Sequence, residues 1–89
     1  MNKVRRRELA KISDRLSKAR DVLSYIKSDL EYVLNDEEDS LDNMDSFSGT
    51  ERYAAMEDAI SNMSDAVDSL EEAVDEIDSA IGSIDSAQN

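Results

Sequence analysis

One row of apolar side chains in the second half of the sequence constrains the fold most. The row advances by alternating steps of three and four residues, the heptad spacing of a helix that packs lengthwise against another helix. Its members are Tyr53, Met56, Ile60, Met63, Val67, Leu70, Val74, Ile77, Ile81 and Ile84. An alanine strip recurs every seven residues beside this row, at Ala59, Ala66, Ala73, Ala80 and Ala87. We therefore predict a long helix over residues 49–87.

The first half of the sequence repeats the same spacing. Its apolar row consists of Leu9, Ile12, Leu16, Ala19, Leu23, Ile26, Leu30 and Val33. This row predicts a helix over residues 3–35, with Asn2 as its N-cap. Acidic and serine residues at 36–48 interrupt the row and predict a connector. Ser48 and Glu51 have the spacing of a capping box, which places the start of the second helix near residue 49.

Two helices of similar length joined by a short connector predict an antiparallel hairpin, and the charge distribution supports that fold. Residues 1–27 carry a net charge of +6, whereas residues 28–89 carry −18. In an antiparallel hairpin the basic start of the first helix lies beside the acidic end of the second. Each charge cluster then compensates the unfavourable effect of the other on its helix dipole. The fold class that we expect is all-α, as a single helical-hairpin domain.

A second apolar surface remains once the two rows have packed against each other. Apart from the alanine strip, its members lie on the first helix, and Tyr25 and Tyr32 share a face because they are seven residues apart. We expect self-association, as a homodimer that forms a four-helix bundle, since a lone two-helix seam is marginal in stability. The candidate residues are Val22, Tyr25, Tyr32, Ala59, Ala66, Ala73 and Ala80.

The remaining positions of the second helix are strongly acidic. Its candidate partner-binding residues, which we call the acidic face, are Asp65, Asp68, Glu72, Asp75 and Glu76. Such a surface imitates the dense negative charge of a nucleic-acid backbone and would suit a basic nucleic-acid-binding enzyme. The competing interpretation is a solvated helix face. The absence of lysine after residue 27 favours the first, because solvated faces usually mix both signs of charge.

Several classes of function are disfavoured by composition. The sequence has no cysteine or histidine, and its connector acids lack the glycine of a calcium-binding loop. We expect no enzyme activity, no cofactor, no metal site and no direct nucleic-acid binding. No apolar run is long enough to span a bilayer, and the basic start has no following apolar segment, so we expect a cytoplasmic protein without membrane contact.

Two resemblances add context. The start MNKVRRRELAKISDRLSKA, the segment GTERYAAMEDAISNM and the acidic heptads resemble small uncharacterised helical proteins of Gram-positive phages and mobile elements. That likeness implies a setting in which many small acidic proteins inhibit host defence enzymes. Phe47-Ser48-Gly49 also resembles the turn of the secreted Trp-x-Gly hairpins, with phenylalanine in place of tryptophan. Tyr53-Ala-Ala-Met-Glu57 has the form of that family's export signal, although it lies at the start of the helix.

Two functions therefore stay open at the level of sequence. One is a non-enzymatic inhibitor of anti-CRISPR or anti-restriction type, whose acidic face occupies the basic cleft of a nucleic-acid-processing host enzyme. The other is a structural or assembly protein that works through its helical interface, including the secreted-hairpin version.

Overall fold

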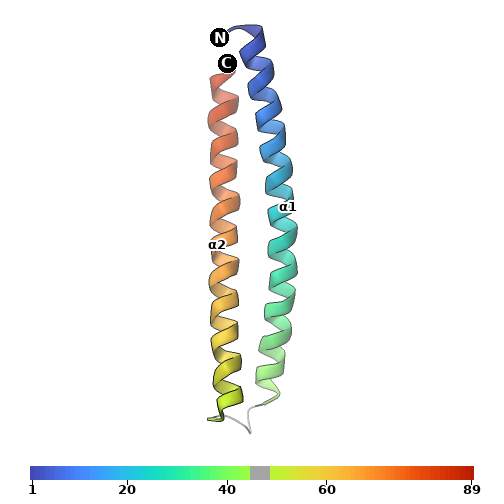
Figure 1. Ribbon diagram of the computed structural model, residues 1–89, viewed down its shortest axis with the longest axis vertical. Coiled ribbons are helices and arrows are strands. Elements are labelled where there is room, and N and C mark those ends of the chain that lie inside the picture. Colours follow the sequence, from blue (N-terminus) through green and yellow to red (C-terminus); the bar gives the residue numbers. More distant parts are fainter. Residues whose placement is uncertain (45–48) are drawn as a thin grey trace.

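The protein is an antiparallel pair of long helices. The computed structural model describes residues 1–44 and 49–89, which contain α1 (Lys3–Asp42) and α2 (Glu51–Ala87) and no strand. Both ends of the chain lie at the same end of the pair (Figure 1). The molecule measures 67 × 14 × 14 Å, and its radius of gyration is 19.9 Å, against about 12 Å for a compact domain of this length. The predicted all-α hairpin is confirmed.

Side chains just outside each helix define where it begins. Asn2 caps α1 as predicted, because its Oδ1 accepts a hydrogen bond from the backbone N–H of Arg5 at 2.8 Å. α2 begins after Thr50, whose hydroxyl accepts from the N–H of Tyr53 at 3.1 Å. Gly49 precedes this cap with a φ of 89°, a conformation that side chains with a Cβ rarely adopt.

α1 continues seven residues beyond its expected end at residue 35. The prediction of a connector from residue 36 is wrong because its first residues contain no glycine or proline to stop the helix, and glutamate is a good helix former. Leu34 and Leu41 are seven residues apart and keep one helix face in contact with α2. Phe47 and Ser48, and with them the predicted capping box, lie outside the described residues.

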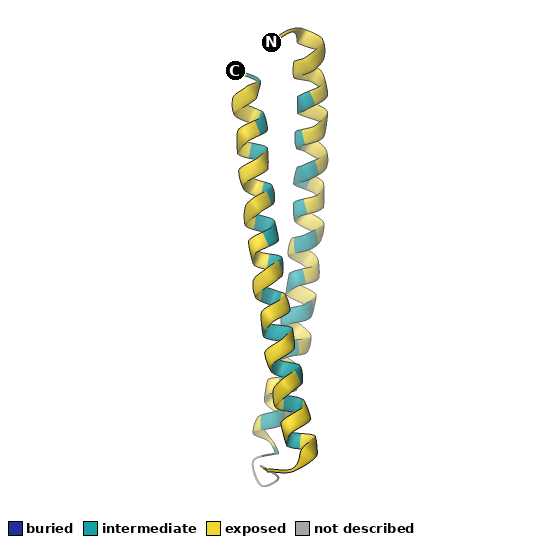
Figure 2. Ribbon diagram, turned by 60° about the vertical axis from the view of Figure 1, so that its left-hand side comes forward, coloured by how far each residue is buried: buried dark blue, intermediate teal, exposed yellow. Residues whose placement is uncertain are grey.

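α2 turns towards α1 the row that its sequence predicts. All ten apolar residues of that row are half-buried, including Met56 and Met63. Figure 2 shows these half-buried positions as a stripe along the helix, with exposed residues on the remaining sides. No residue of the described part of the chain is fully buried, as expected when a helix is covered by only one neighbour.

α1 packs through a different row from the one predicted. Leu9, Leu16, Leu23 and Leu30 are half-buried, but Ile12, Ala19, Ile26 and Val33 are exposed. The leucines alternate instead with the residues that directly follow these four exposed ones, and three of those residues are polar. The half-buried row of α1 is Leu9, Ser13, Leu16, Arg20, Leu23, Lys27, Leu30, Leu34, Glu37 and Leu41, and Met44 continues it beyond the helix. Ser17 and Glu31 are also half-buried, at the edge of this row.

Three polar members of this row, Ser13, Arg20 and Lys27, help to explain the rotation of α1, since each of them contacts an oxygen on α2. Ser13 donates to Asp85 at 3.0 Å, and Arg20 Nη1 donates to Asp78 at 2.7 Å.

Lys27 forms the third contact, with its Nζ lying 3.6 Å from Glu71. The leucines of α1 have an apolar row on one side and a mainly polar row on the other, and these three contacts accompany the orientation in which the polar row lies against α2. The predicted meeting of opposite charges therefore occurs in the middle of α1. Among the described residues, no ion pair joins the first four basic residues of α1 to α2.

Candidate interaction surfaces

The polar contacts run along one side of the hairpin. On α2, Glu71 and Asp78 occupy the heptad position next to one edge of the packed row, and Asp85 continues that line. Arg20 also contacts its neighbour Asp21 at 3.3 Å, and Lys27 lies 3.7 Å from Glu31. This side is therefore already occupied by ion pairs within the chain.

Arg20 is held against α2 by a short hydrogen bond. Its short hydrogen bond to Asp78 raises the pKa of the Arg20 guanidinium, although desolvation acts in the opposite direction. The guanidinium thus remains an obligate donor to α2. In this rotational setting of α1 the guanidinium reaches α2, although an exposed ion pair contributes little to stability by itself.

The opposite side of the hairpin is apolar. The alanine strip of α2 occupies the other edge of its packed row, so it faces away from the ion pairs. On α1, the exposed residues beyond the leucines lie on this same side, because the polar row occupies the other edge. Together with Val22 we call them the apolar band, made of Ile12, Ala19, Val22, Ile26 and Val33.

The apolar band is exposed to an extent unusual for such residues. Ile26 is 47% exposed, Val33 52% and Val22 56%. In the alanine strip, Ala59 and Ala73 are half-buried, whereas Ala66 and Ala80 are exposed. The structure thus gathers Val22 and the predicted alanines on one side, and it adds three β-branched residues that the sequence analysis assigned to the hairpin core.

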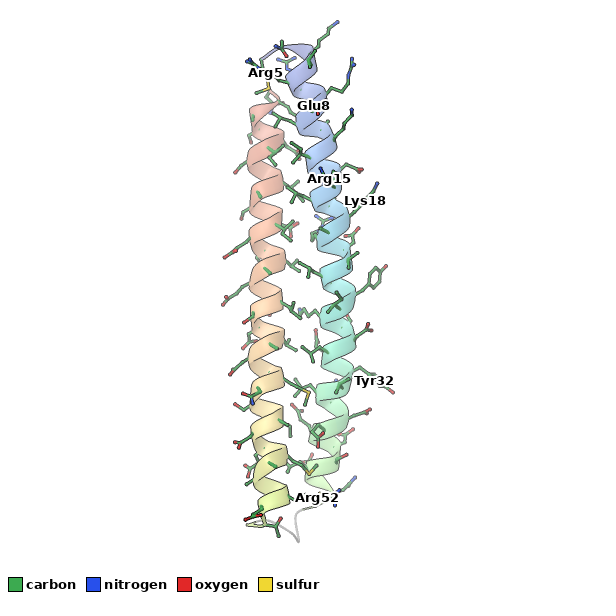
Figure 3. The ribbon with its side chains drawn as sticks, viewed as in Figure 1. Arg5, Glu8, Arg15, Lys18, Tyr32 and Arg52 are labelled. Atoms are coloured by element: carbon green, nitrogen blue, oxygen red, sulfur yellow. The ribbon has the colours of Figure 1, made fainter. Side chains whose placement is uncertain are left out.

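Tyr25 and Tyr32 lie further round α1. They are 74% and 70% exposed, and Figure 3 shows Tyr32 extending from α1 away from α2. The two tyrosines share one heptad position, which lies next to that of Val22 on the outer surface of α1. They therefore border the apolar band rather than the alanine strip. A neighbour that covers the band would meet the tyrosines only at its margin.

The acidic face lies on the outer surface of α2. All five of its residues are exposed, at heptad positions opposite the packed row. In the described part of the chain, the salt bridges of α2 use Glu71 and Asp78, and none uses a member of the acidic face. Acids that stabilise the hairpin are therefore separated from acids that are open to solvent.

The described residues show no group of three or more His, Cys, Asp or Glu arranged to hold a metal ion. Neither α1 nor α2 is long and apolar enough to cross a membrane. No family model, curated protein or solved structure matches the chain. Its function must therefore be inferred from the two surfaces, the acidic face and the apolar side.

Proposed function

We propose that the chain is a non-enzymatic protein–protein interaction module whose acidic face binds the basic cleft of a nucleic-acid-processing enzyme. The observation that supports this is the separation of acids on α2, where the inner ones pair with α1 and the outer ones have no such partner among the described residues. In this proposal the protein acts in the cytoplasm as an inhibitor of phage or mobile-element origin, of anti-CRISPR or anti-restriction type.

The density of negative charge along α2 can be compared with that along DNA. α2 carries eleven acids and one arginine over 37 residues. At a rise of 1.5 Å per residue, this is one negative charge per about 5 Å, against one per about 3.4 Å along a DNA strand. The helix is therefore a sparser version of one strand. Binding would depend strongly on salt, because the attraction acts between exposed charges.

The test is capture of basic proteins from host lysate on immobilised protein. The variant D68K/E72K/D75K reverses three charges of the acidic face, and we expect it to lose the proteins that the wild type retains. The matched control is D36K/E38K/D39K on α1, which changes the net charge equally at exposed positions. Circular dichroism establishes that both variants keep their helices.

The experiment must distinguish binding through the acidic face from binding that depends only on the net charge of the protein. We expect the control variant to retain its partner and duplex DNA to displace that partner from the wild type. Equal loss of binding by both variants would show that only net charge matters. Capture that added DNA cannot displace would argue against a surface that substitutes for nucleic acid.

The apolar side favours a second function, in assembly. We propose that the hairpin self-associates through the apolar band and the alanine strip to form a dimeric four-helix bundle. Helices of such bundles have apolar stripes wider than a two-helix seam needs, and α1 has one. A structural hairpin, including one of the secreted Trp-x-Gly type, would work through this surface alone.

Sedimentation equilibrium at micromolar concentration tests the assembly. A particle of twice 9.9 kDa is expected. A monomer at all concentrations would remove the assembly proposal and leave the acidic face as the single candidate surface.

A further inference from the structure

We infer that the apolar side is covered by a second copy of this chain lying antiparallel to the first, with α1 against α1 and α2 against α2. The inference rests on the proposed self-association and specifies its geometry. Two arrangements bring the apolar sides of two hairpins face to face. In one, both connectors lie at the same end. In the other, each connector lies beside the termini of its partner.

The surface area supports a second copy as the occupant. The accessible surface is 6458 Å², whereas a folded monomer of 9.9 kDa exposes about 5,200 Å². The excess of about 1,250 Å² exceeds the roughly 800 Å² that each partner contributes to a standard interface. A standard interface with one identical hairpin would remove about two thirds of this excess.

The charge of the two halves of the hairpin decides between the arrangements. The contacts of Arg20 with Asp78 and of Lys27 with Glu71 place the midpoint of the hairpin near residues 23 and 74. By sequence, the terminal half, 1–23 with 75–89, carries a net charge of +1, and the connector half, 24–74, carries −13. Parallel hairpins would set two strongly acidic halves side by side, whereas antiparallel hairpins set each against a nearly neutral half.

The apolar band itself has matching symmetry. An axis crossing α1 between Val22 and Ile26 brings the β-branched residues of one band against those of the other, with Ile12 near Val33. Arg15 lies one heptad before Val22, and Asp29 lies one heptad after it. Both are exposed, and in the antiparallel arrangement the arginine of each copy meets an acidic stretch of the other.

Distances between spin labels test the orientation. The sequence has no cysteine, so Lys11→Cys or Asp39→Cys introduces a single labelling position. Both residues are exposed and lie outside the apolar band, at the heptad position of Tyr25 and Tyr32. With the axis near residue 24, antiparallel copies separate the two labels by about 40 Å at position 11 and about 45 Å at position 39. Parallel copies keep both separations below about 25 Å.

Each labelled variant is measured by pulsed electron paramagnetic resonance and by sedimentation at the same concentration. A dimer with long distances at both positions supports the inference. A dimer with short distances overturns the orientation but leaves self-association intact. A monomeric mass overturns both, and the proposal for the acidic face is then unaffected. Dilution with unlabelled protein must weaken the dipolar signal, because the signal arises between two copies.

Discussion

The two helices of this hairpin use their apolar residues differently. α2 places all ten members of its apolar row against α1, and its other faces are polar or carry alanine. α1 places its leucines against α2 but leaves the apolar band outside, while Arg20 and Lys27 occupy the packed row. α2 therefore uses its whole apolar row inside the hairpin, whereas α1 also carries exposed apolar residues outside its packed row.

This difference indicates how many neighbours each helix is suited to. A row with two apolar positions per heptad is sufficient for a single neighbour, whereas a third apolar position widens the stripe to cover two. On α1 the leucines form one apolar stripe with Ile12, Ala19, Ile26 and Val33, and only the leucine edge of this stripe faces α2. The polar contacts of α1 with α2 fix which part of the stripe faces inward, and the rest stays available for another chain.

The largest effect is expected from Ile26→Asp. If the apolar band is the dimer interface, a charge at its centre enters twice in a symmetric dimer. We expect dimer dissociation to become at least about 100-fold easier, or roughly 3 kcal/mol. Sedimentation equilibrium over a range of concentrations measures this change.

The control for that variant is Ser28→Asp, which adds the same charge at an exposed position away from the band. It should leave the dimer unchanged. If both substitutions leave the mass unaltered, the unequal use of apolar residues by the two helices has no role in assembly.

The next largest effect is expected from making α1 resemble α2. The triple variant S13L/R20L/K27L replaces the polar members of the packed row. Half-burying each leucine contributes about 1 kcal/mol, while exposed ion pairs contribute little, so we expect Tm to rise by roughly 10 °C. α1 would then have apolar residues on both sides of its leucines, and sedimentation should show mixed oligomers. A lower Tm would mean that the polar contacts stabilise the hairpin more than apolar packing does.

A smaller effect is expected at the seam itself. Leu23 is half-buried against α2, so Leu23→Ala should lower the free energy of unfolding by about 1.5 kcal/mol, below the range for fully buried leucines. Urea unfolding measures it, and the loss should persist in the Ile26→Asp background. If the loss disappears there, Leu23 contributes to the interface between copies rather than to the hairpin.

The sequence predicts some of these features and leaves others open for physical reasons. The ten-residue row of α2 has no competing stripe, so its orientation follows from spacing alone. On α1, Leu23 is flanked by Ile26 on one side and Lys27 on the other, and hydrophobicity favours the wrong choice. The side that faces α2 depends on Asp78 and Glu71, which lie more than 40 residues away in the sequence. Residues 36–42 are not recognised as helix from the sequence because acidic residues predominate there and Glu37 interrupts the apolar row, but Leu41 continues that row and no residue in the segment stops a helix.

The smallest effect is expected from a substitution that changes the intrinsic helix propensity of α2. α1 contains no glycine, whereas α2 contains Gly82 at an exposed position, and a Cβ added there meets nothing within 4 Å. Gly82→Ala should therefore stabilise the hairpin by about 0.5–1 kcal/mol, since alanine restricts the unfolded chain and favours the helix. Gly49→Ala is the matched control. Space is equally free there, but the φ of 89° makes alanine strained, so the same change should destabilise. Urea unfolding of the two variants beside the wild type should give shifts of opposite sign. Two shifts of the same sign would show that backbone conformation does not distinguish these glycines.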